Sequence, residues 1–200
     1  MAKSKEEIRL DLVVKAREIL KDKGLDYLTA RKLSDYSGYS VGTIYNQFKS
    51  MDNLVMWENC LTLDELYQYV SKAEKTSDVY KNLNNLLEKF VDFVLENKSL
   101  WFTLYNFHFR SIMEKYEISY LKRIVKIIKI LEKNLFKLFA KVPSNERTLS
   151  TEVLGIAIFA MSSLLTTEKE FSHLKKKYVV KILFNTYLAG MSRLSKNGLF

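Results

Sequence analysis

Residues 28–48 constrain the fold more than any other segment, because they hold start signals for two short helices separated by a glycine. Thr29 and Ser40 each precede a short periodic run, and a hydroxyl there accepts a hydrogen bond from a free amide of the first helical turn. Gly38 stands where the first helix must end, since glycine adopts the positive φ that a tight turn needs. The segment is therefore predicted to be a helix-turn-helix, which can place its second helix in a DNA major groove.

Apolar residues flank each cap at the spacing of a hydrophobic staple, which fixes the angle at which the chain enters a helix. The two pairs are Leu28 with Leu33 and Tyr39 with Ile44. Upstream, apolar residues at helical spacing predict a helix from about residue 5 to 23, which Gly24 ends and which supports the other two. The resulting three-helix core leaves five polar side chains free to contact DNA: Arg31, Thr43, Tyr45, Asn46 and Gln47.

Several short motifs in the first 58 residues carry a family resemblance. They are the Gly24 helix end, Leu-Thr-Ala-Arg-Lys-Leu at 28–33, the Ser-Gly-Tyr-Ser turn at 37–40, and Gly-Thr-Ile-Tyr-Asn-Gln-Phe at 42–48, followed by Ser50, Asp52 and Leu54. With these motifs, residues 8–58 resemble the TetR family of bacterial transcriptional regulators. The resemblance implies a homodimer in which each subunit gives one recognition helix, residues 40–46, to half of an approximately palindromic operator in double-stranded DNA.

The resemblance also implies roles for individual residues. Those at positions that meet base edges are Arg31, Val41, Gly42, Thr43, Asn46 and Gln47, and those at positions that touch phosphates are Thr29, Tyr45 and Lys49. The chemistry agrees, because arginine pairs bidentately with guanine, and asparagine or glutamine with adenine. The alternatives are that Tyr45 packs in the core and that Arg31 and Gln47 are merely solvated. Where the family often has a lysine at the start of the fourth helix this chain has Met51, and Lys49 is the expected substitute contact.

Helical spacing continues to the end of the chain, and one proline with six glycines in 200 residues favours long helices. The sequence therefore predicts an all-α protein. Its nine helices are expected at about 5–23, 30–36, 40–46, 51–75, 78–97, 99–110, 115–141, 147–168 and 174–195. The predicted domains are a helix-turn-helix DNA-binding domain, residues 1–50, and a helical ligand-binding and dimerisation domain, residues 51–200, joined through the fourth helix.

The net charge and the cysteine content say less about function than the motifs do. The formal net charge of +9 permits nucleic-acid binding, yet most of the excess lies outside the predicted DNA-binding domain, and the lysines between Lys115 and Lys141 are interpreted as the solvated face of a helix. The single cysteine, Cys60, excludes an intrachain disulfide, and no cysteine and histidine cluster has zinc-site spacing. The longest nearly apolar run, Val153–Leu165, is too short to cross a bilayer. We therefore expect a soluble cytoplasmic protein without a metal or cofactor.

Aromatic residues gather in the middle third of the chain, where TetR-like proteins usually bind ligands. Such sites are mostly apolar with a few directed polar groups, so we predict a pocket for a small apolar or aromatic molecule. The predicted lining residues are Trp57, Trp101, Phe102, Tyr105, His108 and Phe109. The alternative is that these aromatic side chains are plain core.

The last two predicted helices combine large apolar side chains with small residues that let helices approach closely. Two such helices from each subunit would form a four-helix bundle, as the resemblance implies, although a core within one subunit gives the same pattern. The predicted interface residues are Ile156, Ala160, Leu164, Leu188 and Met191.

These observations predict a transcriptional regulator, most simply a repressor that a small-molecule ligand releases from its operator. The alternative is a ligand-independent DNA-binding or chromosome-organising protein of the same fold. An enzyme is not expected, because His108 and His173 have no identifiable nucleophile partner and no paired-carboxylate or phosphate-binding motif is recognisable.

Overall fold

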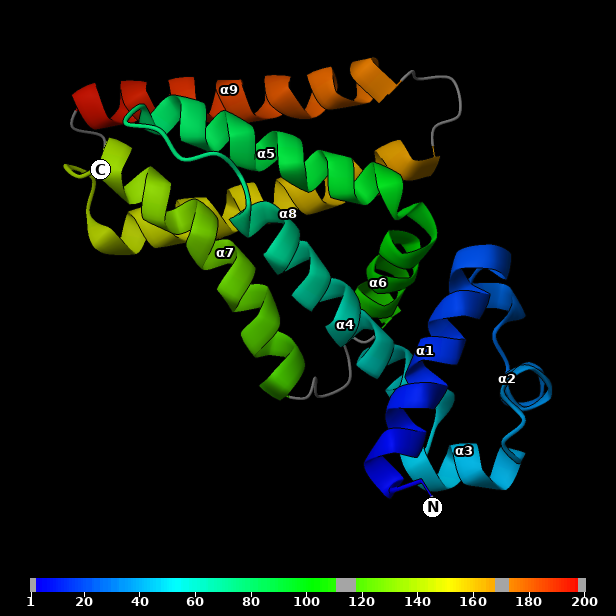
Figure 1. Ribbon diagram of the computed structural model, residues 1–200. Helices are drawn as coiled ribbons and strands as arrows, with labels where there is room; N and C mark the ends of the chain where they lie inside the picture. The colour runs from blue at the N-terminus through cyan, green and yellow to red at the C-terminus, as the bar shows by residue number, and fades with distance from the viewer. Residues whose placement is uncertain (1–2, 111–117, 168–172, 198–200) are drawn as a thin grey trace. The chain divides into compact units, whose positions relative to one another are not determined.

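The computed structural model describes residues 3–110, 118–167 and 173–197 (Figure 1). In these ranges the chain forms nine α-helices, one 3-10 turn (η1) and no strand. The helices are α1 (Lys5–Lys23), α2 (Ala30–Ser37), α3 (Val41–Phe48), α4 (Met51–Ser71), α5 (Val79–Glu96), α6 (Lys98–Arg110), α7 (Ile118–Leu138), α8 (Ser144–Thr167) and α9 (His173–Asn197), and η1 is Leu25–Tyr27. The all-α fold predicted from the sequence is confirmed.

The helix ends follow local capping chemistry. Ser4 and Glu7 form a capping box on α1, in which the Glu7 N–H donates to Ser4 Oγ at 3.2 Å and the Ser4 N–H donates to Glu7 Oε2 at 2.6 Å. Gly24 ends α1 at φ 80°, as predicted. Two differences from the predicted bounds are that α3 continues to Phe48 and that α4 ends at Ser71. The turn η1 was not predicted, since three residues carry no periodicity.

The chain divides into two compact units. The first unit comprises residues 1–64 and 97–121, and the second comprises residues 65–96 and 122–200. The predicted DNA-binding domain, residues 1–50, lies wholly inside the first unit, which also contains the first two-thirds of α4 and all of α6.

An apolar core holds the helices of the first unit together. Helix α1 contacts α2, α3 and α6, and the core contains the stripe of α1 predicted from its spacing. Both predicted staple pairs lie in or against this core. Leu100 of α6 is fully buried in it beside Leu54 and Val55 of α4, so two helices outside the helix-turn-helix complete its hydrophobic support.

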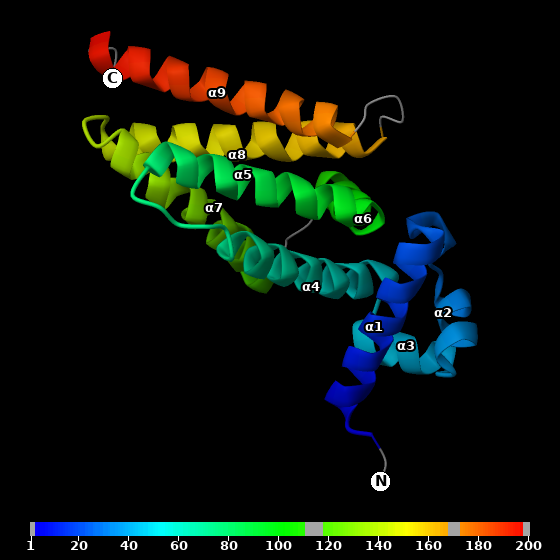
Figure 2. The same cartoon turned by 45° about the horizontal axis from the view of Figure 1, so that its top comes forward.

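The second unit has its own core, built from α5, α7, α8 and α9. Helices α5, α8 and α9 run side by side in both views (Figures 1 and 2), and each contacts the other two. Leu135 of α7 and Phe184 of α9 are buried in this core. The lysines of α7 at 122, 126, 129, 133 and 137 form an exposed row on its other face, while Lys115 lies outside the described residues.

Among the described helices, the Ser144–Thr166 segment of α8 is long and apolar enough to cross a membrane by length and composition. This segment is longer than the run Val153–Leu165 considered from the sequence. Core helices of soluble proteins also meet this criterion, and α8 packs against α5 and α9 through the second core.

Candidate nucleic-acid interface

The turn between α2 and α3 has the geometry predicted from its caps. Thr29 Oγ1 accepts a hydrogen bond from the Lys32 N–H at 3.2 Å, and Ser40 Oγ accepts one from the Thr43 N–H at 3.0 Å. Gly38 adopts the left-handed conformation, with φ 78° and ψ 0°, and its N–H donates to the Ser34 carbonyl. A side chain at Gly38 would be strained in this conformation, so the short turn depends on glycine.

The structure brings the predicted base-reading residues together on two neighbouring helices. Arg31 at the start of α2 is exposed, as are Val41, Gly42 and Asn46 of α3. Thr43 and Gln47 are half-buried, and the Thr43 hydroxyl also shares a hydrogen bond of 2.9 Å with Ser40 Oγ. Buried Ile44 and Phe48 anchor the opposite face of α3 in the core. Helix α3 therefore presents a polar outer face from a fixed position.

The three predicted phosphate-contacting residues are all exposed. The Tyr45 side chain retains 44% of its accessible surface, so its predicted position outside the core agrees with a phosphate contact. The Thr29 hydroxyl accepts a hydrogen bond at the cap of α2 and keeps its own proton for donation. Met51 is half-buried against the core of the first unit, whereas Lys49 is exposed.

Lys49 has an unusual backbone conformation, with φ 68° and ψ −38° at the C-cap of α3. A residue with a Cβ at such a φ stores strain of about 1 to 3 kcal/mol, which persists only where the surroundings impose it. Its N–H donates to the Tyr45 carbonyl at 2.9 Å and closes α3. Glycine at position 49 would relieve this strain. The presence of lysine there is explained if its ammonium group contacts a DNA phosphate.

The substitution Lys49→Gly is therefore expected to stabilise the protein by about 1 kcal/mol and to weaken operator binding. Loss of one phosphate contact lowers affinity equally for all DNA sequences and makes binding less salt-dependent. Urea unfolding and DNA titrations at several salt concentrations measure the two effects. Lys49→Ala is the matched control, because it removes the same charge and keeps the strain. Equal stability of the two variants would contradict the strain, and unchanged affinity in both would contradict the phosphate contact.

Polar contacts also brace the turn and α2 against α1. Asp11 Oδ2 of α1 accepts hydrogen bonds from Lys3 Nζ at 2.7 Å and from Tyr39 Oη at 2.9 Å. The bond from Lys3, and then that from Tyr39, lowers the pKa of the Asp11 carboxyl group. These contacts connect the segment before α1 to the residue just before Ser40. They help to fix where α3 begins.

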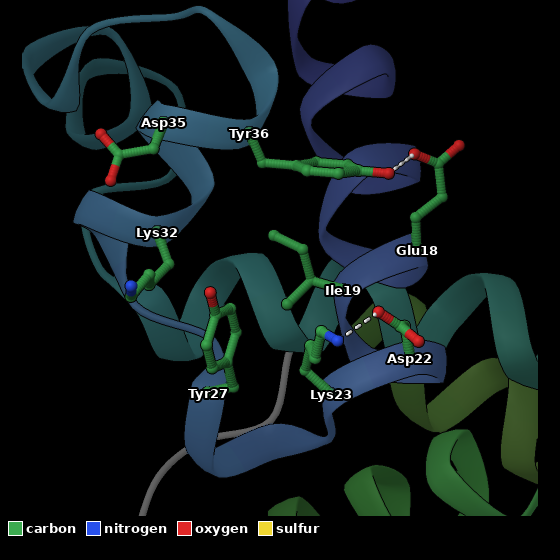
Figure 3. Close-up of a pocket in the computed structure, with 8 residues that line it drawn as sticks. All are labelled: Glu18, Ile19, Asp22, Lys23, Tyr27, Lys32, Asp35 and Tyr36. Atoms are coloured by element: carbon green, nitrogen blue, oxygen red, sulfur yellow. Dashed lines mark hydrogen bonds and ion pairs between the residues drawn. The ribbon is translucent and has the colours of Figure 1, made fainter.

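A groove of about 290 Å³ lies between α1, η1 and α2 in the first unit (Figure 3). Across it, Tyr36 Oη of α2 donates a hydrogen bond to Glu18 Oε2 of α1 at 2.9 Å. On the α1 side of the groove, Lys23 Nζ pairs with Asp22 Oδ2 at 3.1 Å. The Lys32 ammonium group lies 5.0 Å from the centre of the Tyr27 ring. The Tyr36 bond therefore joins α2 to its supporting helix across the groove.

A buried polar cluster, formed by Arg17, Glu58 and Thr62, connects α1 to α4. Arg17 Nη1 donates to Glu58 Oε1 at 2.6 Å and to Thr62 Oγ1 at 2.9 Å, and Thr62 Oγ1 donates to Glu58 Oε1 at 2.8 Å. Glu58 and Thr62 are fully buried and Arg17 nearly so. The sequence prediction missed this cluster. The sequence feature that could have indicated the cluster is that Arg17 and Glu58 each occupy a core position in an apolar helix stripe. A charge at such a position requires a partner.

The predicted ligand residues have different environments in the first unit. Trp101 is fully buried, Tyr105 and His108 are half-buried, and Trp57 and Phe102 are exposed. The Arg9 guanidinium group stacks on the Trp57 ring at 5.1 Å. Burial lowers the pKa of His108, which favours a neutral imidazole at pH 7. Phe109 belongs to α6, but its side chain lies outside the described residues.

The predicted interface residues separate into two groups. Ile156, Ala160 and Leu164 follow one face of α8, where Ile156 and Leu164 are 69% and 59% exposed. Leu149 and Val153, also exposed, extend this row at helical spacing. In contrast, Leu188 and Met191 of α9 are buried in the core of the second unit, and their side chains are not available on its surface. The residues along that face of α8 form the α8 stripe: Leu149, Val153, Ile156, Ala160 and Leu164.

Residues 12–56 match the pattern of the family described as "Bacterial regulatory proteins, tetR family". A comparison with curated protein sequences gave no match. Among solved structures, a tetR-family transcriptional regulator from Streptomyces coelicolor is 14% identical, with a TM-score of 0.67 over 100% of this chain and 90% of that chain.

Two other solved structures are similar along nearly their whole length. The TetR family transcriptional regulator PfmR from Thermus thermophilus is 18% identical, with a TM-score of 0.58 over 89% of this chain and 97% of that chain. RolR in complex with the ligand resorcinol is 15% identical, with a TM-score of 0.65 over 95% of this chain and 88% of that chain. Similarities at this level of identity establish the fold.

Proposed function

Because this chain belongs to the TetR family of bacterial transcriptional regulators, we propose that it is a cytoplasmic, homodimeric repressor that leaves its operator when a small molecule binds. The observation that carries the DNA-binding part is the polar outer face of α3. The caps at the starts of α2 and α3, the Gly38 conformation and the buried side chains of Ile44 and Phe48 hold that face in one orientation. Such a helix fits the major groove, where base edges can be distinguished.

Recognition of a specific sequence requires a dimer, since one short helix covers too little DNA. A two-fold dimer places two recognition helices on half-sites about one helical turn (~34 Å) or a multiple apart. The α8 stripe supports the dimer, because its large apolar side chains are exposed on one face of a long helix. A partner's copy of the same stripe would bury it in a self-complementary interface.

Release by a ligand is supported by the aromatic side chains on α4 and α6 and by the link between α4 and α1. RolR, which has the same fold, holds resorcinol, a small aromatic ligand. A ligand that binds against α4 can move α1, because the buried cluster of Arg17, Glu58 and Thr62 joins these helices directly. The ligand must bind the released conformation more tightly than the DNA-bound one in order to shift the equilibrium.

Selection of bound sequences from random DNA, followed by titration with variants, tests the proposed base readers. Arg31→Ala and Gln47→Ala are each expected to reduce discrimination at one operator position by about 1 to 3 kcal/mol. Tyr45→Phe is expected to weaken binding to all sequences, because it removes a phosphate contact without touching a base.

Tyr27→Phe is the matched control for Tyr45→Phe, since Tyr27 is an exposed tyrosine of the same unit on η1. Selection that enriches no sequence at all would refute the proposed function. If an operator is found and Arg31→Ala and Gln47→Ala leave its sequence preference unchanged, the assignment of those base readers is wrong.

A further inference from the structure

Asn59 is a fully buried amide on α4 whose polar atoms have no partner in the described part of the chain. Its exposed fraction is 0%, and neither Oδ1 nor Nδ2 makes a hydrogen bond there. A buried donor or acceptor without a partner is strongly unfavourable, since it has lost water and gained nothing in return. Such groups in a folded protein therefore require an explanation.

Two polar residues near Asn59 on α4 do make hydrogen bonds within the protein. Glu58 Oε1 accepts hydrogen bonds from Arg17 and Thr62, and Thr62 Oγ1 also accepts one from Arg17. These three residues form a cluster of opposite charges and a hydroxyl. Asn59 is next to this cluster in the sequence and takes no part in its hydrogen bonds, so the link between α1 and α4 does not account for its amide.

Both apolar and polar residues are buried one helical turn from Asn59 on α4, Thr62 among the polar ones. Val55 precedes Asn59 by one helical turn on the same face, and it packs in the core with Leu100 of α6. Leu63, one turn further along α4, is buried as well. Buried apolar side chains with a few directed polar groups are the usual composition of a small-molecule site.

We propose that Asn59 recognises the ligand of this regulator, and that the ligand is a neutral molecule with a hydrogen-bond donor beside an acceptor, as in a carboxamide or a lactam. The inference rests on the proposed ligand-controlled function. The Asn59 amide offers the complementary pair, in which Nδ2 donates to the ligand carbonyl and Oδ1 accepts from the ligand N–H. A neutral ligand matches a neutral amide, whereas an anion would bring a further charge into a buried region.

Titration calorimetry and thermal unfolding of the full-length protein with benzamide and 1-naphthamide test the proposal. Naphthalene and 1-naphthoate are the comparison probes, because they share the ring and lack the donor and acceptor pair or the neutral charge. We expect at least one carboxamide to bind and to raise the melting temperature, with naphthalene and 1-naphthoate at least tenfold weaker. In Asn59→Leu the carboxamide affinity is expected to fall at least tenfold, while the affinity for naphthalene stays or rises.

Asn53→Leu is a matched control on the same helix. Asn53 is an exposed asparagine whose Nδ2 donates a hydrogen bond to the Phe48 carbonyl at 2.8 Å. Without any probe, Asn53→Leu is expected to lower the melting temperature, while Asn59→Leu leaves it unchanged or raises it. Asn53→Leu should keep the carboxamide affinity. A lower melting temperature for Asn59→Leu, or equal binding of amide and hydrocarbon probes, would overturn the proposal, as would the absence of carboxamide binding to the wild-type protein. Operator selection with the wild-type protein tests the proposed function separately, since it needs no probe.

Discussion

The double substitution Ile156→Glu/Leu164→Glu is expected to convert the proposed dimer into a monomer and to lower operator affinity by roughly 100-fold or more. Both side chains are large, apolar and exposed on the α8 stripe. Two carboxylates on each subunit would have to be buried without cationic partners, because the same stripe of both subunits lies in a two-fold interface. Sedimentation measures the oligomeric state, and titration with the selected operator measures affinity.

Tyr80→Glu is the control for this experiment, because Tyr80 is an exposed large side chain of the second unit that lies on α5. It adds a carboxylate to the same unit without touching the α8 stripe. We expect the control to remain a dimer with wild-type affinity. If the double variant behaves like the control, the α8 stripe is not the dimer interface.

The second large effect is expected for Arg17→Met, which should destabilise the first unit by about 3 to 5 kcal/mol. This change removes the cation and leaves the Glu58 carboxylate fully buried. The double substitution Arg17→Met/Glu58→Met replaces the ion pair with apolar side chains of similar size, and such replacements are commonly neutral or stabilising. Urea unfolding followed by circular dichroism measures both variants.

Lys23→Met provides the comparison with an exposed ion pair, since Lys23 and Asp22 have side-chain exposures of 55% and 71%. Its effect on the free energy of unfolding is expected to be much smaller than that of Arg17→Met, because water screens such pairs. The double methionine variant is also expected to bind the operator more weakly than its stability implies, since apolar contacts fix the angle between α1 and α4 less strictly than directed hydrogen bonds do. A double variant as unstable as Arg17→Met would show that loss of the ion pair itself, and not burial of a carboxylate without its cation, determines the loss of stability.

Much of the first unit could be predicted because its signals are local. Thr29, Ser40 and Gly38 act on amides and carbonyls within four residues, so their roles follow from neighbouring positions. The bounds of α1 were correct for the same reason. The ends of α3 and α4 were less accurate, because periodicity does not specify where the last turn stops.

Residues that act across the fold were harder to predict. Leu100 lies in the core of the first unit although it is far from the helix-turn-helix in the sequence, and a local pattern gives no means of pairing them. Similarly, the apolar periodicity of α8 and α9 did not separate surface from core. Ile156 is exposed and Leu188 is buried, and only the packing of α5, α8 and α9 distinguishes the two.

The sequence by itself determined that the chain is helical, where its N-terminal helices begin and that it resembles TetR regulators, because capping, periodicity and turn chemistry operate over a few residues. Tertiary structure decided which charged and polar residues meet. Arg17 finds Glu58 41 positions away, while Asn59, the next residue, takes no part in that bond. Burial makes the bond between Arg17 and Glu58 and the Asn59 amide important, since a polar group removed from water must have a partner. Only the folded chain determines which partner is within reach.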